Sequence, residues 1–205
     1  EALASAMEGS ELFLTYQPKI DLATSAVAGF EALVRWQHPR LGTVFPDQFI
    51  PLAESSGLID QVTDTVIALG LQEKHIWGGS PDASLAINIS PSNLRDLGFV
   101  DRLAERCVAA WVALDRIVLE VTESAAMADP VGAMDVLTRL RLKGIRLSID
   151  DFGTGYSSLA ELARLPFSEL KIDKSFVMAL GGSPEAVQIV KSTIDLAHNL
   201  GLQAV

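Results

Sequence analysis

Two adjacent carboxylates, Asp150 and Asp151, stand in the stretch "RLSIDDFGTGYSSL" (146–159), between an apolar run and a glycine-rich turn. Their negative charges repel, and burying either one without a partner costs several kcal/mol. We therefore expect the pair either to lie in water, as an isolated Asp-Asp before a glycine usually does, or to serve a cation. The elements that hold these residues decide between the two possibilities.

From residue 84 onward, short apolar segments alternate with segments of helical periodicity. The expected strands are "SLAINIS" (84–90), "RIVLEVTE" (116–123), "IRLSIDD" (145–151) and "SELKIDK" (168–174), and another begins at "LQAV" (202–205). A helix is expected near 184–200. This alternation predicts parallel strands joined by crossover helices, in either an open doubly wound sheet or a closed barrel.

Side chains alternate between the two faces of a strand, and this property separates the two architectures. In each of the first four strands, bulky apolar residues take one face, while the other face carries Asn88, Glu120, Asp150 or Lys171. A parallel sheet with helices on both sides should be apolar on both faces. We therefore expect an α/β chain folded as a (β/α)8 TIM-like barrel, with these polar residues inside, near the carboxyl ends of the strands, where barrel active sites form.

The first part of the chain adds two strands and two helices to this barrel. The strands are expected within 11–22 and 26–36, joined by a turn near 23–25, and the helices at 47–55 and 59–76. The second of these strands contributes Glu31. Because such a barrel typically needs about 250 residues, and the 205-residue sequence ends as a seventh strand begins, we expect the barrel to be truncated at its C-terminus.

The polar residues at these strand ends form an oxygen-rich set without sulfur or imidazole. Its members are Glu31, Asn88, Glu120, Asp150 and Asp151. Such ligands suit Mg²⁺ or Mn²⁺ better than Zn²⁺ or copper, and a cation would turn the repulsion between the two aspartates into coordination. Two bridged metals could activate water against a phosphodiester. Taken alone, each member of this set could instead be a hydrogen-bonded group of the core. Lys171 is either a structural ion-pair partner or a participant in the reaction.

Composition limits the remaining function classes. The 205 residues carry a formal net charge of −10, which argues against binding polymeric nucleic acid through non-specific phosphate contacts. The single cysteine, Cys107, falls in a helical pattern and excludes an internal disulfide or a cysteine zinc cluster. No segment resembles a signal peptide or a spanning helix. These features favour a cytoplasmic location for this part of the chain. The parent protein could still be longer and tethered to a membrane.

The motifs in this order resemble the EAL domain of cyclic-di-GMP phosphodiesterases. They are "YQPK" (16–19), "EALVRW" (31–36), "INIS" (87–90), "LEVTE" (119–123), "DDFGTGYSSL" (150–159) and "LKIDKSFV" (170–177), and the match runs from about residue 11 to the end. The resemblance implies a modified barrel whose first strand is antiparallel. It also implies hydrolysis of cyclic-di-GMP to linear 5′-pGpG with Mg²⁺ or Mn²⁺.

The resemblance further implies roles for the residues of the metal centre. Glu31, Asn88, Glu120 and Asp150 would be metal ligands, and Asp151 would bind a second metal. Lys171 would help to position the attacking water and stabilise charge at the phosphorus. With Glu31 and Asp151, it makes up the expected catalytic set.

Three more residues take their expected roles from the resemblance. Gln17 would contact guanine and Arg35 a phosphate of the ligand. Glu123 would stabilise the loop that begins at Phe152, which in the family links the metal site to the dimer interface. We therefore expect a homodimer formed through the loop after Asp151 and its neighbouring helix.

The two ends of the sequence also carry expectations. Residues 1–10 are predicted to be an entry helix or linker from an upstream sensory or GGDEF-type domain, and residues 11–205 the barrel domain. Members of the family have a further glutamate, in an "EGVE"-like motif, and a later glutamine that contacts the ligand. The sequence ends at Val205, before both. The alternative to an enzyme is a receptor that binds cyclic-di-GMP without cutting it.

Overall fold

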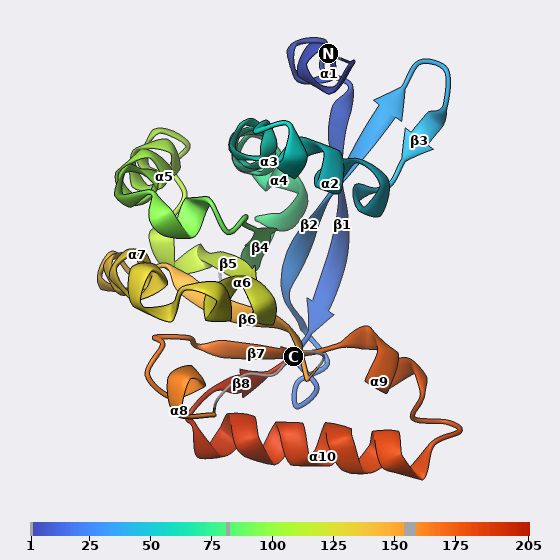
Figure 1. The fold of residues 1–205 in the computed structure, drawn as a ribbon, viewed down its shortest axis with the longest axis vertical. Helices are drawn as coiled ribbons and strands as arrows, with labels where there is room; N and C mark the ends of the chain where they lie inside the picture. Colours follow the sequence, from blue (N-terminus) through green and yellow to red (C-terminus); the bar gives the residue numbers. More distant parts are fainter. Residues whose placement is uncertain (1, 81–82, 154–158) are drawn as a thin grey trace.

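A single sheet of mostly parallel strands forms the centre of the computed structural model, which describes residues 2–80, 83–153 and 159–205. Its strands are β1 (Leu12–Ile20), β2 (Val27–His38), β3 (Gly42–Val44), β4 (Ser84–Asn88), β5 (Ile117–Thr122), β6 (Arg146–Phe152), β7 (Glu169–Ile172) and β8 (Gln203–Ala204). The order across the sheet is β1-β2-β4-β5-β6-β7-β8, with β3 paired to β2 (Figure 1).

The sheet has the topology expected of a barrel with an altered first strand. β1 runs antiparallel to β2, and from β2 through β4, β5, β6 and β7 to β8 each strand is parallel to the next. In the described residues β1 and β8 are the two ends of the sheet, which curves without closing. This confirms the predicted α/β, TIM-like fold class. The short strand β3, which the sequence analysis did not anticipate, extends the sheet beside the end of β2.

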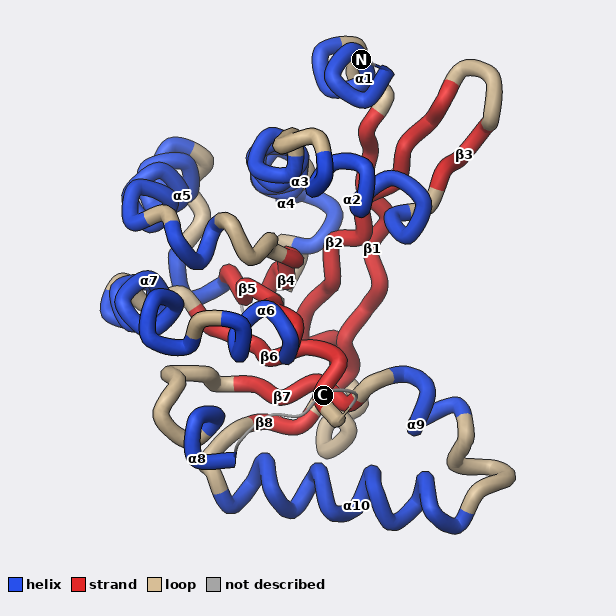
Figure 2. Tube along the Cα trace, viewed as in Figure 1, coloured by secondary structure: helices blue, strands red, loops and turns tan. Residues whose placement is uncertain are grey.

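Helices cover the outer face of the sheet (Figures 1 and 2). They are α1 (Ala2–Glu8), α2 (Pro46–Ser55), α3 (Ile59–Gln72), α4 (Lys74–Trp77), α5 (Leu97–Ala109), α6 (Glu123–Ala128), α7 (Pro130–Leu142), α8 (Leu159–Leu162), α9 (Lys174–Met178) and α10 (Pro184–Asn199). The helix expected at 59–76 is divided at Glu73 into α3 and α4. None of the described helices has the length and apolar character that crossing a membrane requires.

Three of the crossover helices, α5, α7 and α10, begin with a side chain that accepts a hydrogen bond from the first turn. Asp96 caps α5 and Asp129 caps α7, each accepting from the amide two or three residues further on. Ser183 does the same for α10, and in both α7 and α10 a proline follows at the first helical position. Such caps satisfy amides that have no partner within the helix. The sequence thus sets where α5, α7 and α10 start.

The core lies between the apolar faces of the strands and the helices. Leu85, Ile87, Leu119, Leu147 and Ile149 are fully buried, as the alternation of side chains predicts. Cys107 is also buried within this core. The strands β2 and β4 approach closely at Gly29, where an added Cβ would lie 2.4 Å from Ser84 Oγ. A glycine there lets β2, and with it Glu31, sit directly against its neighbour.

Candidate metal centre and active site

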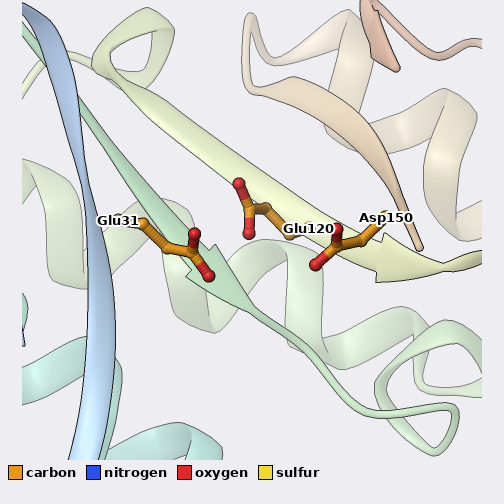
Figure 3. A group of neighbouring side chains, drawn as sticks. All are labelled: Glu31, Glu120 and Asp150. Carbon is orange, nitrogen blue, oxygen red and sulfur yellow. The ribbon is translucent and has the colours of Figure 1, made fainter. Parts of the chain in front are cut away.

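Three carboxylates converge on one ammonium group inside the curved sheet. The Nζ atom of Lys171 lies 2.6 Å from Glu120 Oε2 and 3.1 Å from both Glu31 Oε2 and Asp150 Oδ2. One oxygen of each carboxylate lies within 4.8 Å of the other two. Figure 3 shows the three acidic side chains pointing toward one another from different strands.

Strand register explains why residues so distant in sequence meet. Glu31, Glu120, Asp150 and Lys171 come from β2, β5, β6 and β7. Asn88, at the end of β4, is the register partner of Glu120 and donates a hydrogen bond of 3.0 Å from Nδ2 to Glu31 Oε1. Because all of them occupy the inward positions of their strands, the structure brings this part of the sequence-predicted set together.

The electrostatics of the centre are those of carboxylates crowded around a single cation. Burial raises the pKa of Glu120 to about 8, an effect that the Lys171 ammonium opposes and the charges of Glu31 and Asp150 reinforce. For Glu31, burial also acts upward, but Lys171 holds the pKa of its carboxyl below the usual range. Burial alone would lower the pKa of Lys171, yet attraction to Glu120, Asp150 and Glu31 raises it.

This donor set suits a hard divalent cation. The converging atoms are carboxylate oxygens, and in the described residues they form the group of acidic side chains with a spacing suitable for a metal ion. Glu120 is 1% exposed, and its second oxygen, Oε1, has no hydrogen-bond partner within the described residues. Lys19 Nζ lies 3.9 Å from this oxygen and balances part of its charge, while the carboxylate oxygens that converge on Lys171 supply the ligand set. The residues present therefore fit Mg²⁺ or Mn²⁺.

Asp151 lies outside the converging group. Its backbone adopts a positive φ of 54°, its side chain is exposed, and its amide donates to Asp150 Oδ1 at 2.8 Å. Burial, followed by the charges of Asp150 and Asp173, raises the pKa of Asp151. The adjacent aspartates thus have different surroundings: Asp150 faces Lys171, and Asp151 lies in the electrostatic field of Asp150 and Asp173.

The two residues expected to contact the ligand lie on β1 and β2. Gln17 is the register partner of Glu31 and is exposed. Arg35 lies four residues beyond Glu31 on the same face of β2, and its guanidinium stacks over the Phe45 ring at 5.1 Å. Its Nη1 atom donates to the carbonyl of Val34 at 2.8 Å. Among the described residues, neither side chain is hydrogen-bonded to the three carboxylates, and both lie at the margin of the group.

Glu123 lies where β5 passes into α6. Its carboxylate is buried, and Oε2 accepts a hydrogen bond of 2.9 Å from the amide of Gly153. This contact joins the end of β5 to the end of β6. The rest of the loop expected to carry the dimer contact, residues 154–158, lies outside the described residues.

A second charged group lies beside the first and was missed by the sequence analysis. Lys19 Nζ is 2.8 Å from Glu169 Oε2 and 3.9 Å from Glu120 Oε1. Arg146 lies 3.5 Å from the other oxygen of Glu169. The alternation along β1 and β7 could have indicated this group, because Lys19 follows Gln17 by two residues and Glu169 precedes Lys171 by two.

A cavity of about 460 Å³ opens beside the centre. It is lined mainly by apolar residues of β2, α2 and α3, together with the segment after β4. Asn88 belongs to this lining and donates a hydrogen bond to Glu31, and Asp47 and Glu54 add acceptors to the cavity wall.

Comparison with known proteins places these motifs and this fold in one family. The family model described as the EAL domain matches residues 1–205, the whole chain. The chain belongs to the EAL domain family. The solved structure of the PaMucR phosphodiesterase in complex with c-di-GMP superposes on this EAL domain with a TM-score of 0.92 at 40% sequence identity, covering 98% of this chain and 83% of that one.

Curated relatives of this EAL domain include two proteins of Pseudomonas aeruginosa. MucR, a bifunctional diguanylate cyclase/cyclic di-GMP phosphodiesterase, is 40% identical over 205 residues, 99% of this chain and 30% of MucR. NbdA, a cyclic di-GMP phosphodiesterase, is 42% identical over 208 residues, 100% of this chain and 26% of NbdA. The chain thus spans between a quarter and a third of the length of these relatives.

Proposed function

We propose that this EAL domain hydrolyses cyclic-di-GMP to linear 5′-pGpG with a metal-activated water. The observation that carries the proposal is the convergence of Glu31, Glu120 and Asp150 on Lys171. Support comes from relatives named as cyclic di-GMP phosphodiesterases and from the similar PaMucR domain in its c-di-GMP complex. An oxygen-rich centre beside a cavity is the arrangement that a metal-dependent phosphodiesterase needs.

The metal ligands in this proposal are Glu31, Asn88, Glu120 and Asp150, with Asp151 available to a second ion. Mg²⁺ or Mn²⁺ bound there would supply a water of lowered pKa and offset charge on the phosphate oxygens. Asn88 orients Glu31 through the hydrogen bond between Nδ2 and Oε1. Lys19, held by Glu169, keeps a positive charge on the other side of Glu120.

The remaining roles are those that the family resemblance implies, and the positions of the side chains support them. Lys171 orients the attacking water and stabilises charge that develops on the phosphate, because its ammonium already lies among the carboxylates. Arg35 binds a phosphate and Gln17 a guanine at the margin of the centre. Glu123 holds the end of β6 through Gly153. The apolar cavity receives a base while the scissile phosphate faces Glu31 and Asp150.

The setting of the domain is also part of the proposal. We expect a homodimer through the loop after Asp151 and its neighbouring helix, and a sensory or GGDEF-type domain upstream of residues 1–10 in a cytoplasmic part of the protein. The lengths of the relatives support a longer parent, since MucR is more than three times as long as the part matched here. The helix α1 packs against α3, next to the barrel domain at 11–205.

The decisive experiment is chromatography of cyclic-di-GMP after incubation with the full-length protein and Mg²⁺ or Mn²⁺. We expect a 5′-pGpG peak that is lost in Glu31→Ala and kept in Glu105→Ala, which removes an exposed carboxylate on α5. A folded protein that binds cyclic-di-GMP and yields no product would instead be a receptor. A product that persists in Glu31→Ala would remove this metal centre from the mechanism.

A further inference from the structure

The ammonium of Lys171 lies at the point where the proposed metal ligands converge. It contacts one oxygen of each carboxylate, at 2.6 Å from Glu120 and 3.1 Å from Glu31 and Asp150. The side chains of Lys171 and Glu31 are each 15% exposed and that of Asp150 is 16% exposed, whereas the side chain of Glu120 is fully buried. A single lysine thus balances charge contributed by three strands.

A divalent cation and this ammonium cannot use the same three oxygens together. Mg²⁺ is held by oxygens about 2.0–2.1 Å away. An ion at that distance from all three carboxylates would lie in the space that Nζ now fills, and two positive charges so close repel strongly in a buried setting. The other oxygens of Glu31 and Asp150 already accept hydrogen bonds from Asn88 and from the amide of Asp151. Loading the metal onto the three converging oxygens therefore requires Lys171 to move its ammonium aside.

The neighbouring lysine has no such conflict. Lys19 Nζ is paired with Glu169 at 2.8 Å and is 3.9 Å from the oxygen of Glu120 that Lys171 does not contact. Arg146 also supports Glu169. Lys19 can keep its position when a metal binds. Lys171, on a flexible four-carbon stem, is the cation that has to leave.

We propose that Lys171 is a built-in counter-cation which competes with the divalent metal for Glu31, Glu120 and Asp150. The inference rests on the proposed function, because it concerns the same metal centre. The ammonium stabilises the fold before the metal binds, and the displaced ammonium then faces the attacking water and the phosphate. Because the metal must displace the ammonium, the free energy that Lys171 contributes to the stability of the metal-depleted protein weakens metal binding by the same amount.

The test is a titration of the metal-depleted full-length protein with Mn²⁺ alone in a calorimeter, at constant pH and ionic strength. We expect Lys171→Met to bind Mn²⁺ more tightly than the native protein, on the order of 10-fold or more, and to have a lower Tm before Mn²⁺ is added. Lys171→Arg, which keeps the charge, should bind less tightly than Lys171→Met. Lys174→Met removes an exposed lysine on α9 and should match the native protein.

Equal or weaker Mn²⁺ binding by a folded Lys171→Met protein would overturn the inference and leave the metal centre intact. If neither protein binds Mn²⁺, the metal centre itself fails, and the proposed function fails with it. Should Lys171→Met not fold without metal, it is refolded with saturating Mn²⁺. Recovery of the native circular dichroism spectrum would then support the exchange of one cation for another. Failure to recover the native spectrum would overturn the inference.

Discussion

Lys19 on β1 and Glu169 on β7 form a 2.8 Å ion pair across the interior of the sheet. The two residues are 150 positions apart, and their side chains are 15% and 4% exposed. Because β1 is one end of the sheet and β7 lies next to the other, this pair joins the two ends of a sheet whose strands do not close by hydrogen bonding among the described residues. Removing this ion pair should therefore lower the free energy of unfolding.

We expect Lys19→Met to lower the free energy of unfolding by about 2–4 kcal/mol, because it leaves the buried Glu169 with only the more distant Arg146. Urea denaturation measures the loss. The double variant Lys19→Met/Glu169→Gln should recover at least half of it, since no uncompensated charge remains. Lys191→Met, an exposed lysine on α10, should change little. A single variant as stable as the native protein would contradict the structural role.

Trp111 should destabilise the end of α5. It is 90% exposed and has a φ of 56°, and it lies in a C-terminal turn in which the amide of Val112 donates to the carbonyl of Cys107. The corresponding position after α7 is Gly144, with a φ of 95°. We expect Trp111→Gly to raise the free energy of unfolding by about 0.5–1 kcal/mol.

Trp111→Ala is the matched control, because alanine keeps the Cβ that disfavours a positive φ. It should leave stability unchanged. Gly144→Ala should lower the free energy of unfolding by about 1 kcal/mol, because it places a Cβ at a position of positive φ. Thermal and urea unfolding of the three variants compare these values. A loss of stability in Trp111→Gly would show that the exposed ring makes contacts that outweigh the backbone strain.

Cys107 gives a pH dependence with a defined sign. Burial raises the pKa of its thiol from 9.0 to about 11. Below pH 9 the thiol is protonated in both the folded and the unfolded chain. Between pH 9 and 11 the unfolded chain loses the proton while the folded chain keeps it, so the free energy of unfolding falls, by about 2–3 kcal/mol in total. Urea denaturation at pH 8 and pH 10.5 measures this fall.

The Cys107→Ala variant isolates the contribution of the thiol from other groups that titrate in the same range. We expect it to be less stable than the native protein at pH 8, because a buried side chain has been shortened. The difference between the two proteins should narrow toward pH 11. A constant difference across that range would mean that the thiol ionises as easily in the folded chain as in the unfolded one.

Glu123 should control the protection of the Gly153 amide. The carboxylate is its acceptor at 2.9 Å and is buried. Removing it in Glu123→Ala should speed hydrogen exchange at Gly153 about 10-fold or more, because the amide loses a hydrogen bond to a charged group. Glu123→Gln keeps an acceptor oxygen and should show a smaller increase. Equal exchange rates in all three proteins would mean that the Gly153 amide is protected from exchange by something other than Glu123.

Much of the centre could be predicted from the alternation of side chains along each strand. That rule placed Asn88, Glu120, Asp150 and Lys171 on one face, and the structure brings them together with Glu31. The rule works because one face of each strand is filled by Leu, Ile and Val, so the register cannot slip without exposing them. The family, the fold class and the antiparallel first strand followed from the order of the motifs.

Other features depend on contacts that no local pattern contains. The pairing of Lys19 with Glu169 requires knowing which strands face each other across the interior. The surroundings of Asp151 depend on an irregularity near the end of β6, where its backbone has a positive φ that the residue type alone does not predict. The strand β3 has only three residues and exists because β2 extends beside it. These features come from tertiary packing rather than from propensity.

The contact between Lys171 and Glu31 spans 140 residues of the chain. During synthesis Glu31 leaves the ribosome first, then Glu120 and Asp150, and the balancing lysine comes last. Until then the acidic side chains have no counter-charge from β7 and remain hydrated, and β2 has no ionic contact with the last strands. Contacts of such long range slow folding. The contacts that join β2 to β7 in the barrel interior can therefore form only after Lys171 has left the ribosome.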